Sequence, residues 1–146
     1  MNGKVAAIAH RPSDRDPMVE LTECNIVAGK GLDTENRKPG KREVTLLSKQ
    51  AWDDTCMELG TVLPWWIRRA NFLIDGVDLP ACSGKTLAVG AARILVHGET
   101  RPCQLMDDQH QGLREALKPA WRGGVTGQVL VGGTVRVGDA VLVVEG

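Results

Sequence analysis

One cysteine of this sequence stands in a setting that favours chemistry at its sulfur atom. Cys103 directly follows Pro102, and Arg101 precedes it by two residues. Proline fixes its own backbone angle and donates no backbone hydrogen bond, so we expect Cys103 at a stiff turn and not inside a regular strand. The positive charge of Arg101 favours the thiolate, the form of cysteine that attacks electrophiles and binds metals. The alternative is an ordinary packed thiol, because free cysteine is among the most buried residue types.

The other three cysteines carry weaker signals. Cys24, Cys56 and Cys82 form no C-x-x-C pair with each other or with Cys103, which argues against a zinc site or a thioredoxin-type motif. Cys56 falls on the apolar face of a predicted helix, where a role in the core is expected. The N-terminus lacks the pattern of a signal peptide, and no apolar run approaches the length of a membrane span. We therefore expect a cytoplasmic protein with reduced thiols.

Length and charge limit the class of protein. The chain has 146 residues, a common size for a single domain, and we predict one domain over residues 1–146. Eighteen basic residues balance eighteen acidic ones, for a formal net charge of zero. Proteins that bind nucleic acid or anionic membranes through a general surface show an excess of basic residues. Neither kind of partner is expected here.

Short apolar segments separated by glycine, proline and aspartate predict about ten short strands. One helix is predicted over residues 49–59, with Ser48 as its N-cap and Gly60 just beyond its end. A weaker helical spacing occupies residues 106–117. This pattern predicts a mostly β protein, a barrel or sandwich with one or two short helices. The expected strands cover residues 5–9, 18–27, 44–47, 71–74, 86–89, 92–96, 125–131, 134–137 and 141–144.

Three further features have a functional and a structural interpretation. The glycine-rich turn over residues 29–33, with the basic residues that follow it, could hold an anion, or residues 34–42 could form an ordinary exposed loop. The pair Trp65 and Trp66 could stack on a planar ligand or pack in the core. His110 could donate a proton or be merely solvated.

An ordered set of motifs resembles the MOSC domain family, the molybdenum cofactor sulfurase C-terminal domain. Each motif alone is unspecific, but together they extend over most of residues 29–144 in the order typical of the family. The matching segments are Gly29-Lys30-Gly31-Leu32-Asp33, residues 42–48, Arg68-Arg69-Ala70-Asn71 with the strand after it, residues 84–90, Arg101-Pro102-Cys103, Arg122-Gly123-Gly124-Val125 and residues 132–139. One departure lies in residues 33–37, where stand-alone members commonly have a Gly-Asp pair.

The resemblance implies a MOSC-like β-barrel and a site at Cys103. In the family, the matching cysteine is proposed to carry sulfur as a persulfide or to ligate the molybdenum of molybdopterin, a phosphorylated pyranopterin. A soft thiolate suits such a sulfur-rich metal site. Asn71 has two interpretations, since it could bind the pterin edge or close the end of a strand. The expected cofactor-binding residues are Arg68, Arg69, Asn71, Lys85, Arg101 and Arg122, with the arginines favoured for phosphate.

The resemblance thus predicts a protein that binds the molybdenum cofactor and uses Cys103 for sulfur carriage or for molybdenum ligation. Two alternatives stay open: a molybdenum-dependent reductase of N-hydroxylated compounds, and a non-catalytic β-barrel binding module. The sequence contains neither a pyridoxal-phosphate desulfurase domain nor a set of iron–sulfur ligands. Sulfur transfer would therefore need a separate sulfur donor, and reduction would need an external electron-transfer protein.

Overall fold

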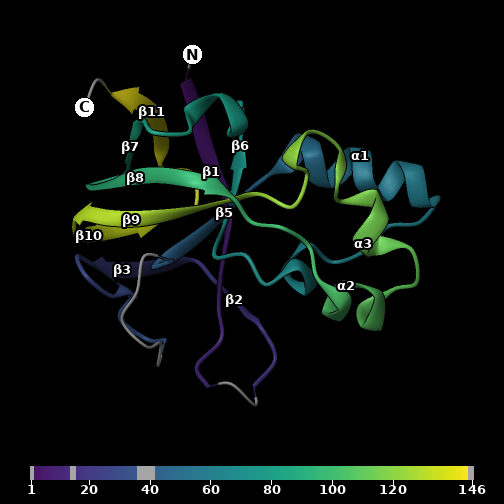
Figure 1. Ribbon diagram of the computed structural model, residues 1–146. Coiled ribbons are helices and arrows are strands. Elements are labelled where there is room, and N and C mark those ends of the chain that lie inside the picture. Colours follow the sequence, from purple (N-terminus) through teal and green to yellow (C-terminus); the bar gives the residue numbers. More distant parts are fainter. Residues whose placement is uncertain (1, 14–15, 36–41, 145–146) are drawn as a thin grey trace.

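A closed seven-stranded barrel forms one half of the molecule in the computed structural model (Figure 1). The structure describes residues 2–13, 16–35 and 42–144. Neighbouring barrel strands follow the order β11-β7-β8-β9-β5-β6-β1, and pairing between β1 and β11 closes the ring. The predicted mostly β barrel is therefore confirmed. Its strands are β1 (Asn2–His10), β5 (Val44–Ser48), β6 (Phe72–Asp75), β7 (Thr86–Val89), β8 (Ala92–Glu99), β9 (Val125–Val131) and β11 (Ala140–Val144).

The other described strands lie at the rim of the barrel. The strand β2 (Val19–Leu21) pairs with the end of β1, while β10 (Gly133–Arg136), β3 (Glu23–Val27) and β4 (Gly31–Leu32) form a second sheet. Side chains of β3 alternate between exposed and buried, as expected for a strand with one face in solvent. The single strand expected over residues 18–27 is thus two strands, and the turn expected over residues 29–33 contains the short strand β4.

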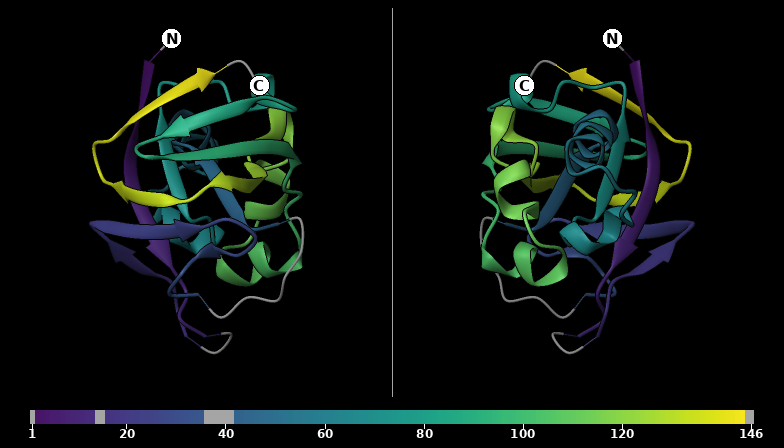
Figure 2. Two further views of the ribbon diagram at one scale, coloured as in Figure 1. Left: turned by 90° about the vertical axis from the view of Figure 1, so that its left-hand side faces the viewer. Right: turned by 90° about the vertical axis from the view of Figure 1, so that its right-hand side faces the viewer.

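The three α-helices in the described part of the chain cover one side of the barrel, and the second sheet lies away from them (Figures 1 and 2). They are α1 (Lys49–Leu59), α2 (Gln104–Gln109) and α3 (Leu113–Ala116), accompanied by the 3-10 turns η1 (Trp65–Arg68), η2 (Pro80–Cys82) and η3 (Pro119–Trp121). The predicted caps of α1 are confirmed: Ser48 Oγ accepts a hydrogen bond from Ala51 N over 3.2 Å, and Gly60 is left-handed with φ of 70°. The helical spacing over residues 106–117 corresponds to α2 and α3, which Gly112 separates at φ of 91°.

The strand β5 divides the interior into two apolar cores. Val44 and Leu46 point into the barrel and belong to its core, whereas Leu47 belongs to a second core between the barrel and the helices. Four consecutive residues of β5 are therefore buried, the pattern of a strand covered on both faces. We call the second cluster the helical core. Its buried members are Ala9, Leu47, Trp52, Cys56, Trp65, Ala70, Leu73, Met106, Leu113 and Leu117.

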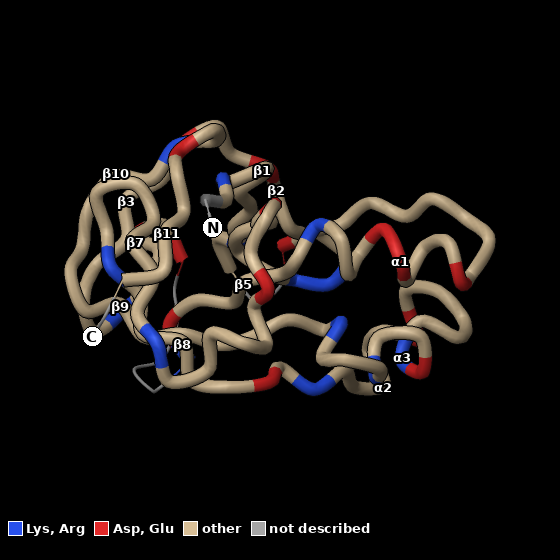
Figure 3. Tube along the Cα trace, turned by 90° about the horizontal axis from the view of Figure 1, so that it is seen from above, with Lys and Arg blue, Asp and Glu red and all other residues tan. Residues whose placement is uncertain are grey.

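Charged residues of both signs are spread over the barrel and the helices (Figure 3). This distribution agrees with the zero net charge of the sequence. Within the described residues, every helix is too short or too polar to cross a membrane.

Candidate functional site at Cys103

Cys103 lies where the barrel meets the helices. The strand β8 ends at Glu99, a short connection follows, and Cys103 is the N-cap residue of α2 (Figure 1). Its extended backbone, with φ of −123°, places it outside the helix, while the preceding Pro102 is buried. Of the four cysteines, all within the described residues, Cys103 is exposed and the other three are buried. The thiol predicted to do chemistry is the one that solvent reaches.

A buried arginine holds the connection that carries Cys103. The Arg68 side chain, at the end of η1, is only 6% exposed. Its Nη2 donates to Thr100 O over 3.0 Å, and its Nε donates to Gly123 O over 2.9 Å. A backbone hydrogen bond joins the same two segments, since Thr100 N donates to Gly124 O over 2.9 Å. One guanidinium therefore fixes both the start of the Cys103 connection and the turn before β9.

The absence of a side chain at Gly123 lets this arrangement form. A Cβ atom at Gly123 would lie 2.7 Å from Thr100 O and 3.2 Å from Arg68 Nη2. The first distance is shorter than van der Waals contact, so any larger residue would push the two segments apart. This packing gives a physical reason for the glycine in Arg122-Gly123-Gly124, a motif that the sequence analysis identified only by resemblance.

The buried charge of Arg68 has no acidic partner within the described residues. Its remaining nitrogen, Nη1, is 3.9 Å from Met106 Sδ, and its other contacts are backbone oxygens. Burial lowers the pKa of Arg68, and the nearby Cys103 opposes that shift. A buried cation without a counter-ion favours an anion close to it. Arg68 thus places a buried positive charge close to Cys103.

Arg101 provides a second, accessible positive charge on the same connection. Its side chain is 89% exposed, and its Nε lies 3.8 Å from Glu99 Oε1 in a long ion pair. Such an exposed pair contributes little to stability and restrains the side chain weakly. The guanidinium of Arg101 is therefore available to an anionic ligand bound beside Cys103.

Asn71 is fully buried, and its amide is occupied by the protein. Its Oδ1 accepts from Thr45 N over 3.0 Å, and its Nδ2 donates to Ala9 O over 3.3 Å. The Asn71 backbone also bonds to Thr45 and Ala9. Of the two interpretations given to Asn71, the structure favours the closing of strand ends, because the residue ties β1, β5 and β6 together.

Glu35 is a buried residue that the sequence analysis missed. It is 5% exposed, and its Oε2 accepts from Arg11 N over 2.9 Å and from Asn71 Nδ2 over 3.3 Å. Residues 34–42 were expected to form an exposed loop, which is wrong at Glu35; residues 36–41 lie outside the described part of the chain. No local pattern marks this glutamate, since its partners are 24 and 36 residues away.

The remaining predicted cofactor-binding residues, Lys85, Arg122 and Arg69, contact other parts of the protein than the connection that carries Cys103. Lys85 is exposed at the start of β7 and lies beside Cys82. Arg122 Nη1 donates to Ala116 O over 3.0 Å and is 3.3 Å from Glu58 Oε1, so it bridges α3 and α1. Arg69 is exposed with a left-handed backbone and lines a small pocket of about 130 Å³ with Trp66 and Gln109, the last residue of α2.

The weaker candidates have mainly structural contacts. Trp65 is buried in the helical core, and its Nε1 donates to Glu20 Oε2 over 3.0 Å, while Trp66 is half-buried. Lys30 Nζ donates to Asp33 O over 2.8 Å within the glycine-rich turn. His110 forms the end of α2. Among the described residues, no group of three or more histidine, cysteine, aspartate or glutamate side chains is arranged to hold a metal ion.

Comparison with known proteins gives one family. The profile of the MOSC domain matches residues 28–142. No curated protein matches the chain. Three solved structures with the same fold are the YuaD protein from Bacillus subtilis and the YiiM proteins from Geobacillus stearothermophilus and Escherichia coli.

The structural likeness covers nearly all of this chain. YuaD is 19% identical, with a TM-score of 0.77, over 97% of this chain and 94% of its own. The Geobacillus YiiM is 15% identical, with a TM-score of 0.79, over 98% of this chain and 75% of its own. The Escherichia YiiM is 15% identical, with a TM-score of 0.72, over 98% of this chain and 70% of its own. At these identities the likeness establishes a shared fold.

Proposed function

The chain belongs to the MOSC domain family, and on that premise we propose that it binds the molybdenum cofactor with Cys103 as the residue that ligates molybdenum or carries sulfur. The family is linked to this cofactor. The observation that carries the proposal is the exposed Cys103 thiol. It lies on a connection that is held by a buried arginine, Arg68, which has no acidic partner among the described residues.

The residues present fit a sulfur-rich metal group. Thiolate is a soft ligand suited to molybdenum held by sulfur, and Cys103 is the exposed cysteine of the chain. The buried positive charge of Arg68 close to Cys103 favours an anionic ligand over a cationic one. The lack of a multi-residue metal site in the described residues also fits, because the pterin would supply other ligands to the metal.

The two arginines nearest Cys103 have different roles in this proposal. Arg68 donates to two backbone oxygens, so it orients the Cys103 connection and supplies fixed positive charge. Arg101 is exposed and is the better donor to the cofactor phosphate, since a guanidinium can bind phosphate through two parallel hydrogen bonds. The proposal therefore assigns ligand contact to Arg101 and positioning to Arg68.

The chemistry supplied by the bound cofactor is that of a redox-active metal with sulfur ligands. The protein's part is to present one thiol to solvent, keep positive charge beside it and hold its backbone in an extended conformation. The stiff Pro102 and the hydrogen bonds of Thr100 restrict the motion of the sulfur relative to the barrel.

A sulfur-loading experiment tests the use of Cys103. The protein is incubated with inorganic polysulfide, a donor of sulfane sulfur, and each cysteine peptide is weighed by mass spectrometry. The proposal predicts an added sulfur atom at Cys103 and none at the buried Cys24 and Cys82 in the folded protein. Absence of loading at Cys103, together with no molybdenum in the purified protein, would favour the non-catalytic binding module.

A further inference from the structure

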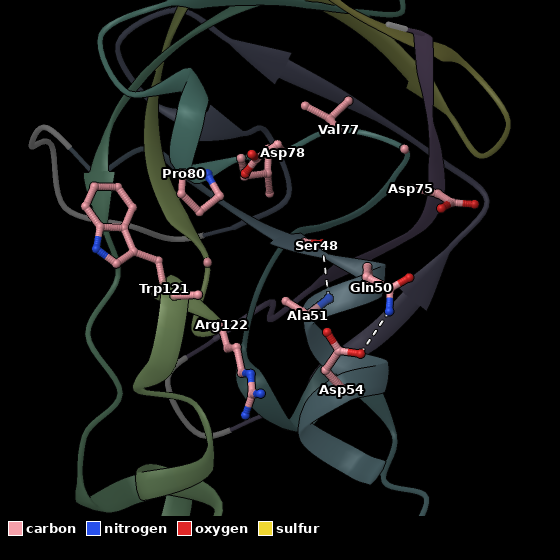
Figure 4. A pocket seen from close by; sticks show the side chains of 14 residues that line it. Ser48, Gln50, Ala51, Asp54, Asp75, Val77, Asp78, Pro80, Trp121 and Arg122 are labelled. Carbon is pink, nitrogen blue, oxygen red and sulfur yellow. Dashed lines mark hydrogen bonds between the residues drawn. The ribbon is translucent and has the colours of Figure 1, made fainter. Parts of the chain in front are cut away.

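A cavity lies between the first turn of α1, the segment after β6 and the turn before β9 (Figure 4). Its volume is about 520 Å³, in the range of small-molecule sites. Neither Cys103 nor Arg68 lines it. The cavity shares the turn of Arg122 and Gly124 with the surroundings of the Cys103 connection, but its lining contains none of the residues to which the proposed function assigns a role.

One part of the cavity is apolar and includes an aromatic ring. Val77 and Leu79 belong to the buried core of the barrel, and the partly buried Trp121 packs against that same core. Figure 4 shows the Trp121 indole on the side of the cavity opposite α1, with Pro80 above it. An indole face attracts planar cations as well as apolar groups.

The rest of the lining contains three carboxylates. Asp54 comes from α1, where it accepts from Gln50 Nε2 over 2.8 Å, and Asp75 and Asp78 come from the segment that ends β6 (Figure 4). Within the described residues, the carboxylates of Asp75 and Asp78 have no hydrogen bond or ion pair. In Figure 4, Asp78 lies on the same side of the cavity as Pro80 and Trp121, whereas the Asp75 carboxylate points away from them. Asp78 is therefore the carboxylate placed to accept hydrogen bonds from a ligand beside Trp121.

The nearby cations do not neutralise these carboxylates by direct pairing. Arg122 lines the cavity, but its Nη1 is engaged by Glu58 Oε1 at 3.3 Å and by Ala116 O at 3.0 Å. Lys49 acts on Asp75 electrostatically, yet its Nζ is paired with Asp53 Oδ2 at 2.9 Å. The cavity therefore combines an apolar, aromatic interior with an excess of negative charge.

We propose that this cavity binds a small organic cation that has a planar, apolar body. The body would lie against Trp121 and Pro80, and the cationic group would face Asp78 (Figure 4). Each part of such a ligand would contact a matching group: π-face with indole, and N–H donors with carboxylate oxygens. An anion of the same shape would be repelled by the three aspartates.

Benzamidine is a suitable probe, because it joins a planar amidinium to an aromatic ring. Its binding to the full chain is measured by titration calorimetry beside benzamide, a neutral molecule of nearly the same shape. We expect saturable binding of benzamidine and at least about fivefold weaker binding of benzamide. The variant Asp78→Asn should weaken benzamidine binding by about fivefold or more.

Two matched controls make the result specific. Asp108→Asn removes an exposed carboxylate from α2, outside the cavity, and should leave the affinity for benzamidine unchanged. Cys103→Ser should also leave it unchanged, so failure of this inference and failure of the proposed function are separate results. The inference is overturned if benzamidine shows no saturable binding, if benzamide binds as tightly, or if Asp78→Asn retains full affinity.

Discussion

The Nη2 of Arg68 donates a hydrogen bond to the carbonyl oxygen of Thr100 over 3.0 Å, across 32 residues of sequence. This contact joins the end of η1 to the connection that presents Cys103. The same guanidinium holds Gly123 O, so three separate segments meet at one buried positive charge. The position of the Cys103 sulfur is consequently set by contacts in the interior of the protein.

Replacement of Arg68 should affect both stability and the chemistry of Cys103. Arg68→Met leaves the carbonyls of Thr100 and Gly123 without their donor, and we expect a loss of roughly 2 kcal/mol in the free energy of unfolding. The folded variant should also be alkylated at Cys103 several-fold more slowly at neutral pH, because the positive charge beside the sulfur is gone. Urea unfolding and the rate of reaction with iodoacetamide measure the two effects.

Arg101→Met serves as the control for that experiment. Its side chain is exposed, so its removal should change the free energy of unfolding by less than about 0.5 kcal/mol. If the Arg68→Met variant has the same unfolding curve and the same alkylation rate as wild type, the positioning role assigned to Arg68 is wrong.

Alanine substitutions at Gly123 and at Gly98 provide a second comparison of a test variant with its control. A Cβ at Gly123 would lie 2.7 Å from Thr100 O, whereas a Cβ at Gly98 on β8 would meet no atom within 4 Å. Gly123→Ala should therefore destabilise the protein by about 1–3 kcal/mol, and Gly98→Ala should have little effect. Thermal and urea unfolding of the two variants test this, and equal stabilities would contradict the close packing described for the Arg68 contacts.

Asn71→Ala separates a structural role from a ligand-binding role. The substitution leaves the buried Thr45 N, Ala9 O and Glu35 Oε2 without the amide that bonds them, and a loss of roughly 3 kcal/mol is expected. Asn25→Ala, at an exposed position, should cost far less. An Asn71→Ala protein of wild-type stability that fails to bind cofactor would instead support direct ligand contact.

Stability should decline in alkaline solution partly through Cys24. Burial, followed by the nearby carboxylates of Asp33, Glu35 and Glu23, raises the pKa of this thiol from 9.0 to about 12. Between these pH values the unfolded chain releases a proton that the folded chain keeps, so the free energy of unfolding falls as pH rises from 9 towards 12. Below pH 9 both states bind the proton, and this contribution is fully present.

The substitution Cys24→Val removes the titrating group at similar volume. Urea unfolding at pH 8, 10 and 11 should show a steeper loss of stability in wild type than in the variant. Parallel losses in the two proteins would show that the Cys24 thiol does not contribute to the alkaline decline.

Much of the fold could be predicted from sequence because its signals are local. The caps Ser48 and Gly60 depend on the backbone of one helix, and the apolar segment at residues 44–47 identifies β5 by itself. The position of Cys103 outside a regular strand, directly after a proline, also follows from local constraints on the chain. For these features, neighbouring residues carry the information.

The functions of individual polar residues could not be predicted in the same way. Arginine is a side chain that commonly binds phosphate, yet the hydrogen-bond partners of Arg68 are backbone oxygens that lie 32 and 55 residues further along the chain. Arg122 is likewise engaged by Glu58 and Ala116. Glu35 is buried because tertiary contacts to Arg11 and Asn71 satisfy it. Sequence reveals the donor groups, and only the fold determines which acceptors they meet.

The central claim, that this protein binds the molybdenum cofactor through Cys103, is tested most directly by the molybdenum content of the purified protein. Wild type, Cys103→Ser and the control Cys82→Ser are expressed in a host that makes the cofactor and analysed for metal per chain. The buried Cys82 Sγ bonds to Asp78 O, a contact that serine can retain. The account predicts bound molybdenum in wild type and Cys82→Ser and its loss in Cys103→Ser. Equal molybdenum in all three proteins would contradict ligation by Cys103 and leave sulfur carriage as its role, whereas no molybdenum in wild type would contradict binding of the metal-loaded cofactor.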